Sequence, residues 1–195
     1  MTPEPVALVT AGSAGLGAVV AKTFARQGYR VVINYSSNSE RAGGLIAQLS
    51  SQQAGQSDGN QGTARYIAIR TDLGAKADIQ RLVEETHRAM GRIDVLFSNG
   101  GWSRFCDTTS INDNVFEEDW DRAFNMNVKS HLWLLHAAKP YLEEAEGSFI
   151  TTSSIAGVRG VGSSLVFNPT YRLWPFYRQL TTARLTVSRR LLNYI

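Results

Sequence analysis

The segment Val6-Ala-Leu-Val-Thr-Ala-Gly-Ser-Ala-Gly-Leu-Gly17 decides the fold that we expect for this chain. Residues 6–10 have the composition of a buried strand, and residues 16–27 carry the spacing of a helix. Between them, Gly12, Gly15 and Gly17 allow a tight turn and let a ligand approach without an intervening Cβ atom. The helix directs its free N–H groups and its positive end at this turn, which suits a pyrophosphate. A glycine-rich connection without a ligand is the alternative.

Short apolar runs alternate with helical patterns along most of the chain. Strands are predicted at residues 6–10, 31–35, 65–70, 93–97 and 148–152, and helices at 16–27, 39–49, 76–90 and 117–141. This alternation predicts right-handed βαβ units, and hence a doubly wound, mostly parallel α/β sheet of Rossmann type with helices on both faces. Residues 50–63 contain one apolar residue, Ala54, and are expected to form a flexible surface insertion.

The helix predicted at 117–141 carries an apolar stripe at helical spacing. We expect its members to lie in the core: Trp120, Phe124, Val128, Leu132 and Leu135. Asn127 lies at the margin of this stripe, where a buried polar group needs a partner. A hydrogen bond from its side chain to nearby backbone would satisfy that need without any catalytic role.

Composition excludes several classes of protein. The chain has 195 residues, of which 43% are apolar and 19% charged, as expected for one ordinary domain. A single cysteine, Cys106, excludes an internal disulfide, and the three histidines lack the spacing of metal ligands, so no metal site is expected. There is no apolar run of membrane-spanning length and no secretory signal, so we expect a cytoplasmic protein that does not bind membranes.

Charge is unevenly distributed. Residues 166–195 contain five arginines and no acidic residue, although the whole chain has a net charge of +3. We therefore expect two regions, a dinucleotide-binding domain over 1–165 and a divergent basic tail over 166–195. Nucleic-acid binding by the tail is not expected, because five charges are few and no recognition motif accompanies them. One hypothesis is that an altered reading of the gene has replaced the catalytic segment.

Several motifs together resemble the short-chain dehydrogenase/reductase family over residues 5–165. The turn Thr10-Ala-Gly-Ser-Ala-Gly-Leu-Gly17 resembles its Thr-Gly-x-x-x-Gly-x-Gly loop, with Ala11 at the first glycine. Asp72-Leu73, Ser98-Asn-Gly-Gly101, Asn127-Val-Lys-Ser130 and Ser153-Ser-Ile-Ala-Gly157 follow in the family's order. The resemblance implies that the cofactor contacts Thr10, Gly12, Ser13, Gly15, Leu16, Gly17, Tyr35, Ser36, Ser37, Asp72, Leu73, Asn99, Gly100 and Gly101.

The end of the second predicted strand indicates which cofactor is preferred. An NAD site usually places Asp or Glu there to bind the ribose 2′-hydroxyl, whereas this strand ends Asn34-Tyr-Ser-Ser-Asn38. Small donors and Arg41, one turn into the next helix, would accept a 2′-phosphate. We expect NADP(H) to be preferred, with NAD(H) as the alternative because Glu40 lies close by. Ser37 or Asn38 is also expected to cap the helix.

The resemblance also implies catalytic residues. Ser154 would bind the oxygen of a small carbonyl or alcohol substrate, and Asn127 would hold a water in a proton relay. The family's proton donor is a Tyr with a Lys four residues later, but Phe167 lies thirteen residues beyond Ser154 and Tyr171 follows it. Tyr171 is the remaining candidate donor. Pro169 disfavours the helix expected there.

Two functions therefore remain open. The first is an NADPH-preferring oxidoreductase that transfers a hydride between the nicotinamide and a carbonyl or alcohol. The second is a catalytically inactive, truncated nucleotide-binding remnant that lacks the Tyr-x-x-x-Lys pair and the last strands of the family fold. A homo-oligomer is not expected, because the family's dimer-forming helix is altered in this sequence.

Overall fold

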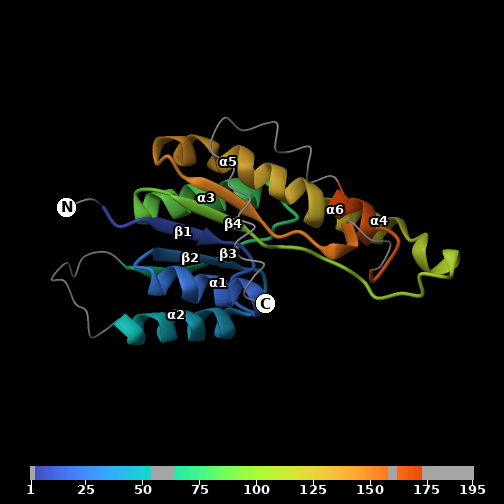
Figure 1. Ribbon diagram of the computed structural model, residues 1–195, viewed down its shortest axis with the longest axis horizontal. Helices are drawn as coiled ribbons and strands as arrows, with labels where there is room; N and C mark the ends of the chain where they lie inside the picture. Colours follow the sequence, from blue (N-terminus) through green and yellow to red (C-terminus); the bar gives the residue numbers. More distant parts are fainter. Residues whose placement is uncertain (1–2, 54–63, 158–161, 173–195) are drawn as a thin grey trace.

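One parallel sheet organises the molecule. The computed structural model describes residues 3–53, 64–157 and 162–172, and within these ranges five parallel strands pair in the order β3-β2-β1-β4-β5 (Figure 1). The strands are β1 (Val6–Val9), β2 (Arg30–Tyr35), β3 (Tyr66–Arg70), β4 (Val95–Ser98) and β5 (Ser148–Thr151). Leu8 pairs with Val32 on one side and with Leu96 on the other, so β1 lies at the centre.

Helices cover both faces of this sheet. α1 (Gly15–Arg26) and α2 (Ser39–Gln53) lie on one face, and α3 (Lys76–Met90) and α5 (Ser130–Glu144) lie on the other (Figure 1). Shorter elements connect them: the 3₁₀ turn η1 (Ile111–Asn114), α4 (Glu117–Phe124), the π-helical turn η2 (Asn125–Lys129), the 3₁₀ turn η3 (Ile155–Gly157) and α6 (Phe167–Arg172).

The core consists of two apolar layers, one on each side of the sheet. Leu8, Val32 and Leu96 pack with residues of α3 and α5, whereas Val9 and Ile33 pack with residues of α1 and α2. Successive side chains of a strand point to opposite faces, so a strand that is covered on both faces must be apolar throughout. The predicted doubly wound α/β fold is confirmed.

Two of our expectations about chain segments were wrong. Residues 50–53 continue α2, because Leu49 is buried and anchors the last turns of that helix; residues 54–63 lie outside the described part. Pro169 lies inside α6. It occupies the third position of that helix, in the first turn, where a backbone N–H has no intrahelical partner to lose.

The predicted long helix over 117–141 is interrupted. The five residues of η2 widen it into a π turn between α4 and α5, and Asn127 lies at the centre of that turn. Of the predicted apolar stripe, Val128 and Leu135 are buried, but Trp120 is 37% exposed. Trp120 was therefore wrongly assigned to the core; its indole N–H donates to the Asn114 carbonyl at 2.8 Å, which holds the ring at the surface.

A buried polar pair connects α5 to the centre of the sheet. Ser98, the last residue of β4, lies with its Oγ 2.5 Å from Nδ1 of His131 in the first turn of α5, and both residues are almost fully buried. Burial lowers the pKa of His131 to about 4, from its ordinary value of 6.5. The imidazole is therefore neutral in the folded protein at neutral pH.

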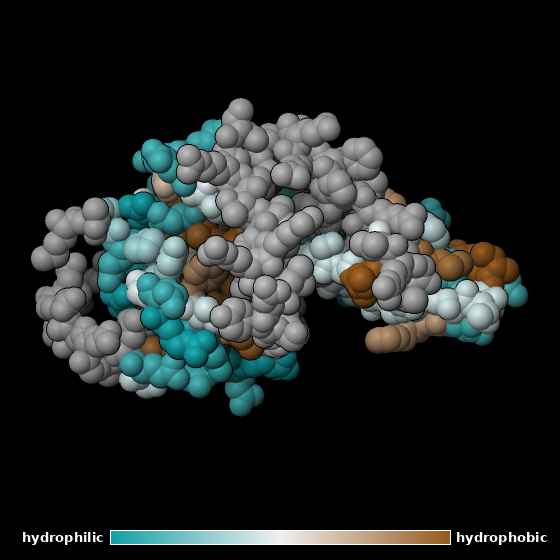
Figure 2. Space-filling view, viewed as in Figure 1, coloured by the Kyte–Doolittle hydropathy of each residue, from teal (hydrophilic) through white to brown (hydrophobic). Residues whose placement is uncertain are grey.

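Apolar surface gathers at one end of the molecule. Phe105 is 90% exposed, and Ile111, Val115 and Phe116 are also exposed, all on the segment between β4 and α4. Figure 2 shows brown surface at this end, beyond the sheet and its helices. In the described part of the chain, no helix has the length and apolar character needed to cross a bilayer.

The pair of Ser98 and His131 predicts how stability depends on pH. The folded protein binds a proton at His131 only near pH 4, whereas the unfolded chain binds it near pH 6.5. Between these values the unfolded state binds more protons, so the free energy of unfolding falls as the pH falls, by up to about 3 kcal/mol. Urea denaturation between pH 7 and about pH 4 measures this loss.

The variant His131→Gln is the matched control. Two carboxylates also respond to acid. The Asp72 backbone N–H lowers the pKa of Asp78, and the Thr109 hydroxyl lowers the pKa of Asp107. Their contribution to the free energy of unfolding therefore falls on acidification, but equally in the parent and in the variant. The variant should show a shallower decline than the parent between pH 6.5 and 4. Parallel declines would contradict the assignment.

Candidate functional site

The strand order places a crevice at one edge of the sheet. From β1 the chain continues to β2 and β3 on one side, then crosses to β4 and β5 on the other. Open α/β sheets bind ligands outside the carboxyl ends of the strands where the order reverses, here between β1 and β4. The loops that follow β1, β2, β3, β4 and β5 meet at this edge, and they carry the residues predicted from the sequence.

The glycine-rich loop after β1 leaves no room for side chains on its inner surface. A Cβ atom on Gly12 would lie 2.8 Å from Ile33, and one on Gly17 would fall against the Ala11 carbonyl oxygen. Gly15, by contrast, has a φ of +51° and open space around its Cα. The loop therefore has a crowded inner side and an open outer side.

The start of α1 supplies free donors to that open side. The first helical backbone bond runs from the Ala18 N–H to the Ala14 carbonyl, and no side chain caps the helix. The amides of residues 15–17 precede this bond and point out of the helix end, as do the first N–H groups of any helix. These donors and the helix dipole form a site for an anion such as a pyrophosphate.

Asn34, which our sequence analysis did not select, holds this loop in place. Its Oδ1 accepts the Ala11 N–H at 2.9 Å, its own carbonyl accepts the Gly12 N–H at 2.9 Å, and its Nδ2 donates to the Thr71 carbonyl at 3.1 Å. The side chain is almost fully buried. The available signal was an amide residue at the end of an otherwise apolar strand.

Thr10 and Asn99 join the loops after β1, β4 and β5. The Thr10 hydroxyl accepts the amides of Asn99 at 2.8 Å and Gly100 at 3.3 Å, and the Asn99 Oδ1 accepts the Thr152 hydroxyl at 2.9 Å. Thr10 has no exposed surface, so its side chain supports the loop from the protein interior and not from the ligand side. Gly100 is buried, and a Cβ atom on it would meet Leu73, whereas Gly101 is exposed.

The end of β2 carries small polar groups. Tyr35 is half-buried and Ser36 and Ser37 are exposed. Asn38 caps α2, since its Oδ1 accepts the Arg41 N–H at 2.8 Å; the predicted cap is confirmed.

Beyond β3, Leu73 is buried and Asp72 is exposed, with its Oδ1 accepting the Gly74 N–H at 2.8 Å. Ser13 is half-buried and Leu16 exposed on the loop after β1.

Asn127 is wholly buried, and the contacts described for its amide are internal. Its Oδ1 accepts the Trp102 N–H at 2.7 Å, and its Nδ2 donates to the Trp102 carbonyl at 2.9 Å and to the Thr170 hydroxyl at 3.3 Å. A bond to backbone, the alternative to a catalytic role, is present, but its partner lies 25 residues away in sequence; the role of Asn127 in a proton relay stays a prediction. Asn127 joins the loop after β4 to α6.

The other two catalytic candidates lie on the segments after β5. Ser154 is half-buried, and its Oγ accepts the Ala156 N–H at 3.2 Å, which leaves its hydroxyl proton available. Tyr171 lies in α6, in the turn that follows Phe167. The tail beyond Arg172 is outside the described residues.

The residues at this edge fit a dinucleotide. The inner surface of the loop excludes Cβ atoms at Gly12 and Gly17, the outer surface presents the uncapped helix end, and the loop after β4 lies beside it. Residues 12–17 would hold the pyrophosphate, and the ends of β2 and β3 would hold the adenosine.

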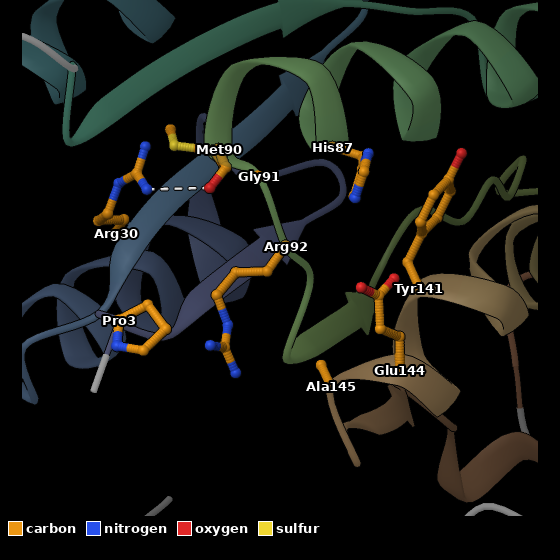
Figure 3. A pocket seen from close by; sticks show the side chains of 9 residues that line it. All are labelled: Pro3, Arg30, His87, Met90, Gly91, Arg92, Tyr141, Glu144 and Ala145. Carbon is orange, nitrogen blue, oxygen red and sulfur yellow. Dashed lines mark hydrogen bonds between the residues drawn. The ribbon is translucent and has the colours of Figure 1, made fainter. Parts of the chain in front are cut away.

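A pocket of about 270 Å³ lies elsewhere, at the amino ends of the strands. Its lining includes Arg30, Arg92, His87, Tyr141 and Glu144 (Figure 3). Arg30 donates to the Met90 carbonyl at 2.9 Å, and Arg92 pairs with Asp94 at 2.5 Å. Because ligands of such sheets bind at the carboxyl ends, we place the candidate site at the opposite edge.

The fold and this edge define a dinucleotide-binding protein of the doubly wound class. The model of the family described as "short chain dehydrogenase" matches residues 5–168, and the chain belongs to that family.

Curated relatives agree with this assignment. The chain is 34% identical over 167 residues to a protein named as granaticin polyketide synthase putative ketoacyl reductase 2 from Streptomyces violaceoruber, covering 85% of this chain and 61% of the relative. It is 31% identical over 163 residues to versicolorin reductase 1 from Aspergillus parasiticus, covering 84% and 57%. The chain thus spans about three fifths of the length of these relatives.

A solved structure is similar as well. A short-chain dehydrogenase from Burkholderia cenocepacia, in complex with NADP, superposes with a TM-score of 0.80 at 27% identity, covering 95% of this chain and 72% of the other.

The conformation of Ala11 predicts a stabilising substitution. Its φ of +47° lies in the left-handed region, which costs a residue with a Cβ atom roughly 1–2 kcal/mol. Ala11→Gly removes this strain but adds freedom to the unfolded chain, a cost of about 0.4–1 kcal/mol. We expect the free energy of unfolding to rise by about 0.5 kcal/mol, measured by urea denaturation. Ala18→Gly, within α1, should instead lower the free energy of unfolding by about 1 kcal/mol. A lower free energy of unfolding in both variants would show that the backbone of Ala11 is not strained.

The contacts of Asn34 predict a larger effect. Asn34→Ala removes the partners of the Ala11 N–H and the Thr71 carbonyl, and each unsatisfied group costs about 1–3 kcal/mol. We expect the free energy of unfolding to fall by about 3 kcal/mol. Asn112→Ala, on the exposed side of η1, is the control and should change it by less than about 0.5 kcal/mol. Equal effects of the two substitutions would show that Asn34 does not hold the loop.

Proposed function

We propose that this chain forms the cofactor-binding part of a short-chain reductase that prefers NADP(H) to NAD(H) and acts on a small carbonyl or alcohol. The observation that carries the cofactor preference is the end of β2, where residues 34–38 contain no carboxylate. A carboxylate there would accept a bond from the ribose 2′-hydroxyl and repel a 2′-phosphate. The similar Burkholderia cenocepacia protein is in complex with NADP and a similar Burkholderia phymatum protein is in complex with NAD, so the preference proposed for this chain rests on the end of β2.

The substrate would lie above the carboxyl ends of β4 and β5. Ser154 has its hydroxyl proton available there, and it would donate to the substrate oxygen. Asn127 would position the loop after β4 through its two bonds to the Trp102 backbone. When bound, the nicotinamide supplies or accepts the hydride. Tyr171 would then supply the proton to the substrate oxygen.

A second candidate is a nucleotide-binding protein without turnover. The observation that favours it is the sequence after Ser154, where Phe167 lacks a hydroxyl and Tyr171, four residues later, has no ammonium group. Loss of a general acid costs about 10²–10⁴ in rate. Nucleotide binding would persist, because the residues that hold the loop after β1 come from β1, β2 and β4.

Binding and turnover measured on the same protein separate the candidates. We expect NADPH to bind about tenfold or more tightly than NADH by calorimetry, since charge-assisted hydrogen bonds to a 2′-phosphate are strong. Oxidation of NADPH by a reactive diketone then tests the reductase. Turnover that Tyr171→Phe abolishes, with NADPH binding unchanged, supports the first candidate.

The remaining outcomes are equally informative. NADPH binding without turnover in the parent protein supports the second candidate. Turnover that survives in Tyr171→Phe removes Tyr171 as the donor. No binding of either dinucleotide contradicts both candidates.

A further inference from the structure

The last residue of the edge strand β3 is an arginine on the face where the adenosine ribose would lie. Ile67 and Ile69 pack in the layer that contains α3, whereas Tyr66 and Ala68 pack in the layer that contains α2. Side chains alternate along a strand, so Arg70 lies on the α2 side. Arg70 is also the register partner of Tyr35, the last residue of β2.

A hydrogen bond fixes the Arg70 guanidinium against the loop between β2 and α2. Its Nε donates to the Ser36 carbonyl at 3.1 Å, and its own carbonyl accepts a bond from Arg81 at 2.9 Å. The side chain is otherwise exposed. A guanidinium has five N–H donors, and the bond to Ser36 engages one of them. The positive charge is therefore held beside Ser36 on an exposed side chain.

This loop lies where the group that distinguishes the two dinucleotides would be bound, the 2′-phosphate of NADP(H) or the 2′-hydroxyl of NAD(H). In doubly wound folds the ribose 2′-position lies at the end of the second strand, and an arginine nearby accommodates a 2′-phosphate. The glycine-rich loop of this chain has no basic residue between Thr10 and Gly17. Asp72 is engaged at the Gly74 amide. Arg41, the other basic residue near this loop, donates its backbone N–H to the Asn38 cap and has an exposed side chain. Arg70 differs from Arg41 because a hydrogen bond holds its guanidinium beside Ser36.

We propose that Arg70 is the residue that binds the 2′-phosphate and sets the selectivity for NADP(H). This inference rests on the proposed function, because it assumes that a dinucleotide binds at this edge. The planar fork of the guanidinium matches a phosphate, and its bond to Ser36 orders it before the ligand arrives. Selectivity then comes from β3, across the loop from the position usually occupied by a carboxylate.

Calorimetric titration of four ligands tests the assignment without turnover. The ligands are NADPH, NADH, 2′-AMP and 5′-AMP, and the proteins are the parent, Arg70→Gln and Arg88→Gln. Glutamine keeps a side-chain N–H for Ser36 but has no charge, and Arg88 is an exposed arginine near the far end of α3. Thermal unfolding of each variant verifies that the fold is retained.

We expect Arg70→Gln to bind NADPH and 2′-AMP about tenfold or more weakly, with affinities for NADH and 5′-AMP changed by less than about twofold. Arg88→Gln should bind all four as the parent does. Added salt should weaken NADPH binding more in the parent than in Arg70→Gln.

Failures of the two proposals look different. If the parent prefers NADPH and Arg70→Gln keeps that preference, the role of Arg70 is overturned and the proposed function stands. If the parent prefers NADH, or binds neither dinucleotide, the proposed function itself is contradicted. Equal losses for NADPH and NADH in Arg70→Gln would show that Arg70 supports the loop without reading the 2′-phosphate.

Discussion

The carboxyl edge of the sheet depends on side chains that satisfy backbone groups where the strands stop pairing. A buried N–H or C=O without a partner costs about 1–3 kcal/mol, and several such groups meet where β1, β2, β3 and β4 end. Asn34 and Thr10 supply the partners: Asn34 bonds Ala11 and Thr71, and the Thr10 hydroxyl bonds the amides of Asn99 and Gly100. Each loop therefore starts from a fixed position.

The bonds of Asn34 to the loop after β1 determine where that loop must contain glycine. Because Asn34 holds Ala11 and Gly12 against β2, there is no space for a Cβ atom at Gly12. A Cβ atom on Gly17, in the first turn of α1, would in turn fall against the Ala11 carbonyl oxygen. The amides of residues 15–17 lie in the first turn of α1, before its first backbone bond, and are donors that suit a pyrophosphate. The crowded inner side of the loop and its free donors are thus neighbouring features of one short segment.

Local signals in the sequence predicted most of the fold. The apolar period over 76–90 matches α3, which ends at a glycine in the left-handed conformation, and Asn38 caps α2 as expected. The π turn around Asn127 could not be predicted, since it accompanies bonds to Trp102, 25 residues away. The role proposed for Arg70 could not be predicted for a similar reason, because it depends on the face of an edge strand that Arg70 occupies and on a bond to Ser36 in the loop after β2.

The two halves of the site differ in how they are held. The nucleotide half is tied together by bonds among the ends of β1, β2, β3 and β4, so its geometry does not require α6. The proposed catalytic half does require α6, because Asn127 bonds both Trp102 and Thr170. Thr170 precedes Tyr171 in α6, so this bond sets the position of the helix that carries the candidate proton donor. Asn127 and Thr170 thus connect α6 to the loop after β4, whereas a Tyr-x-x-x-Lys motif relies on the helical spacing of its own two residues. In the proposed function, dinucleotide binding and proton transfer therefore depend on different contacts, and a substitution in α6 would impair proton transfer before it impaired binding.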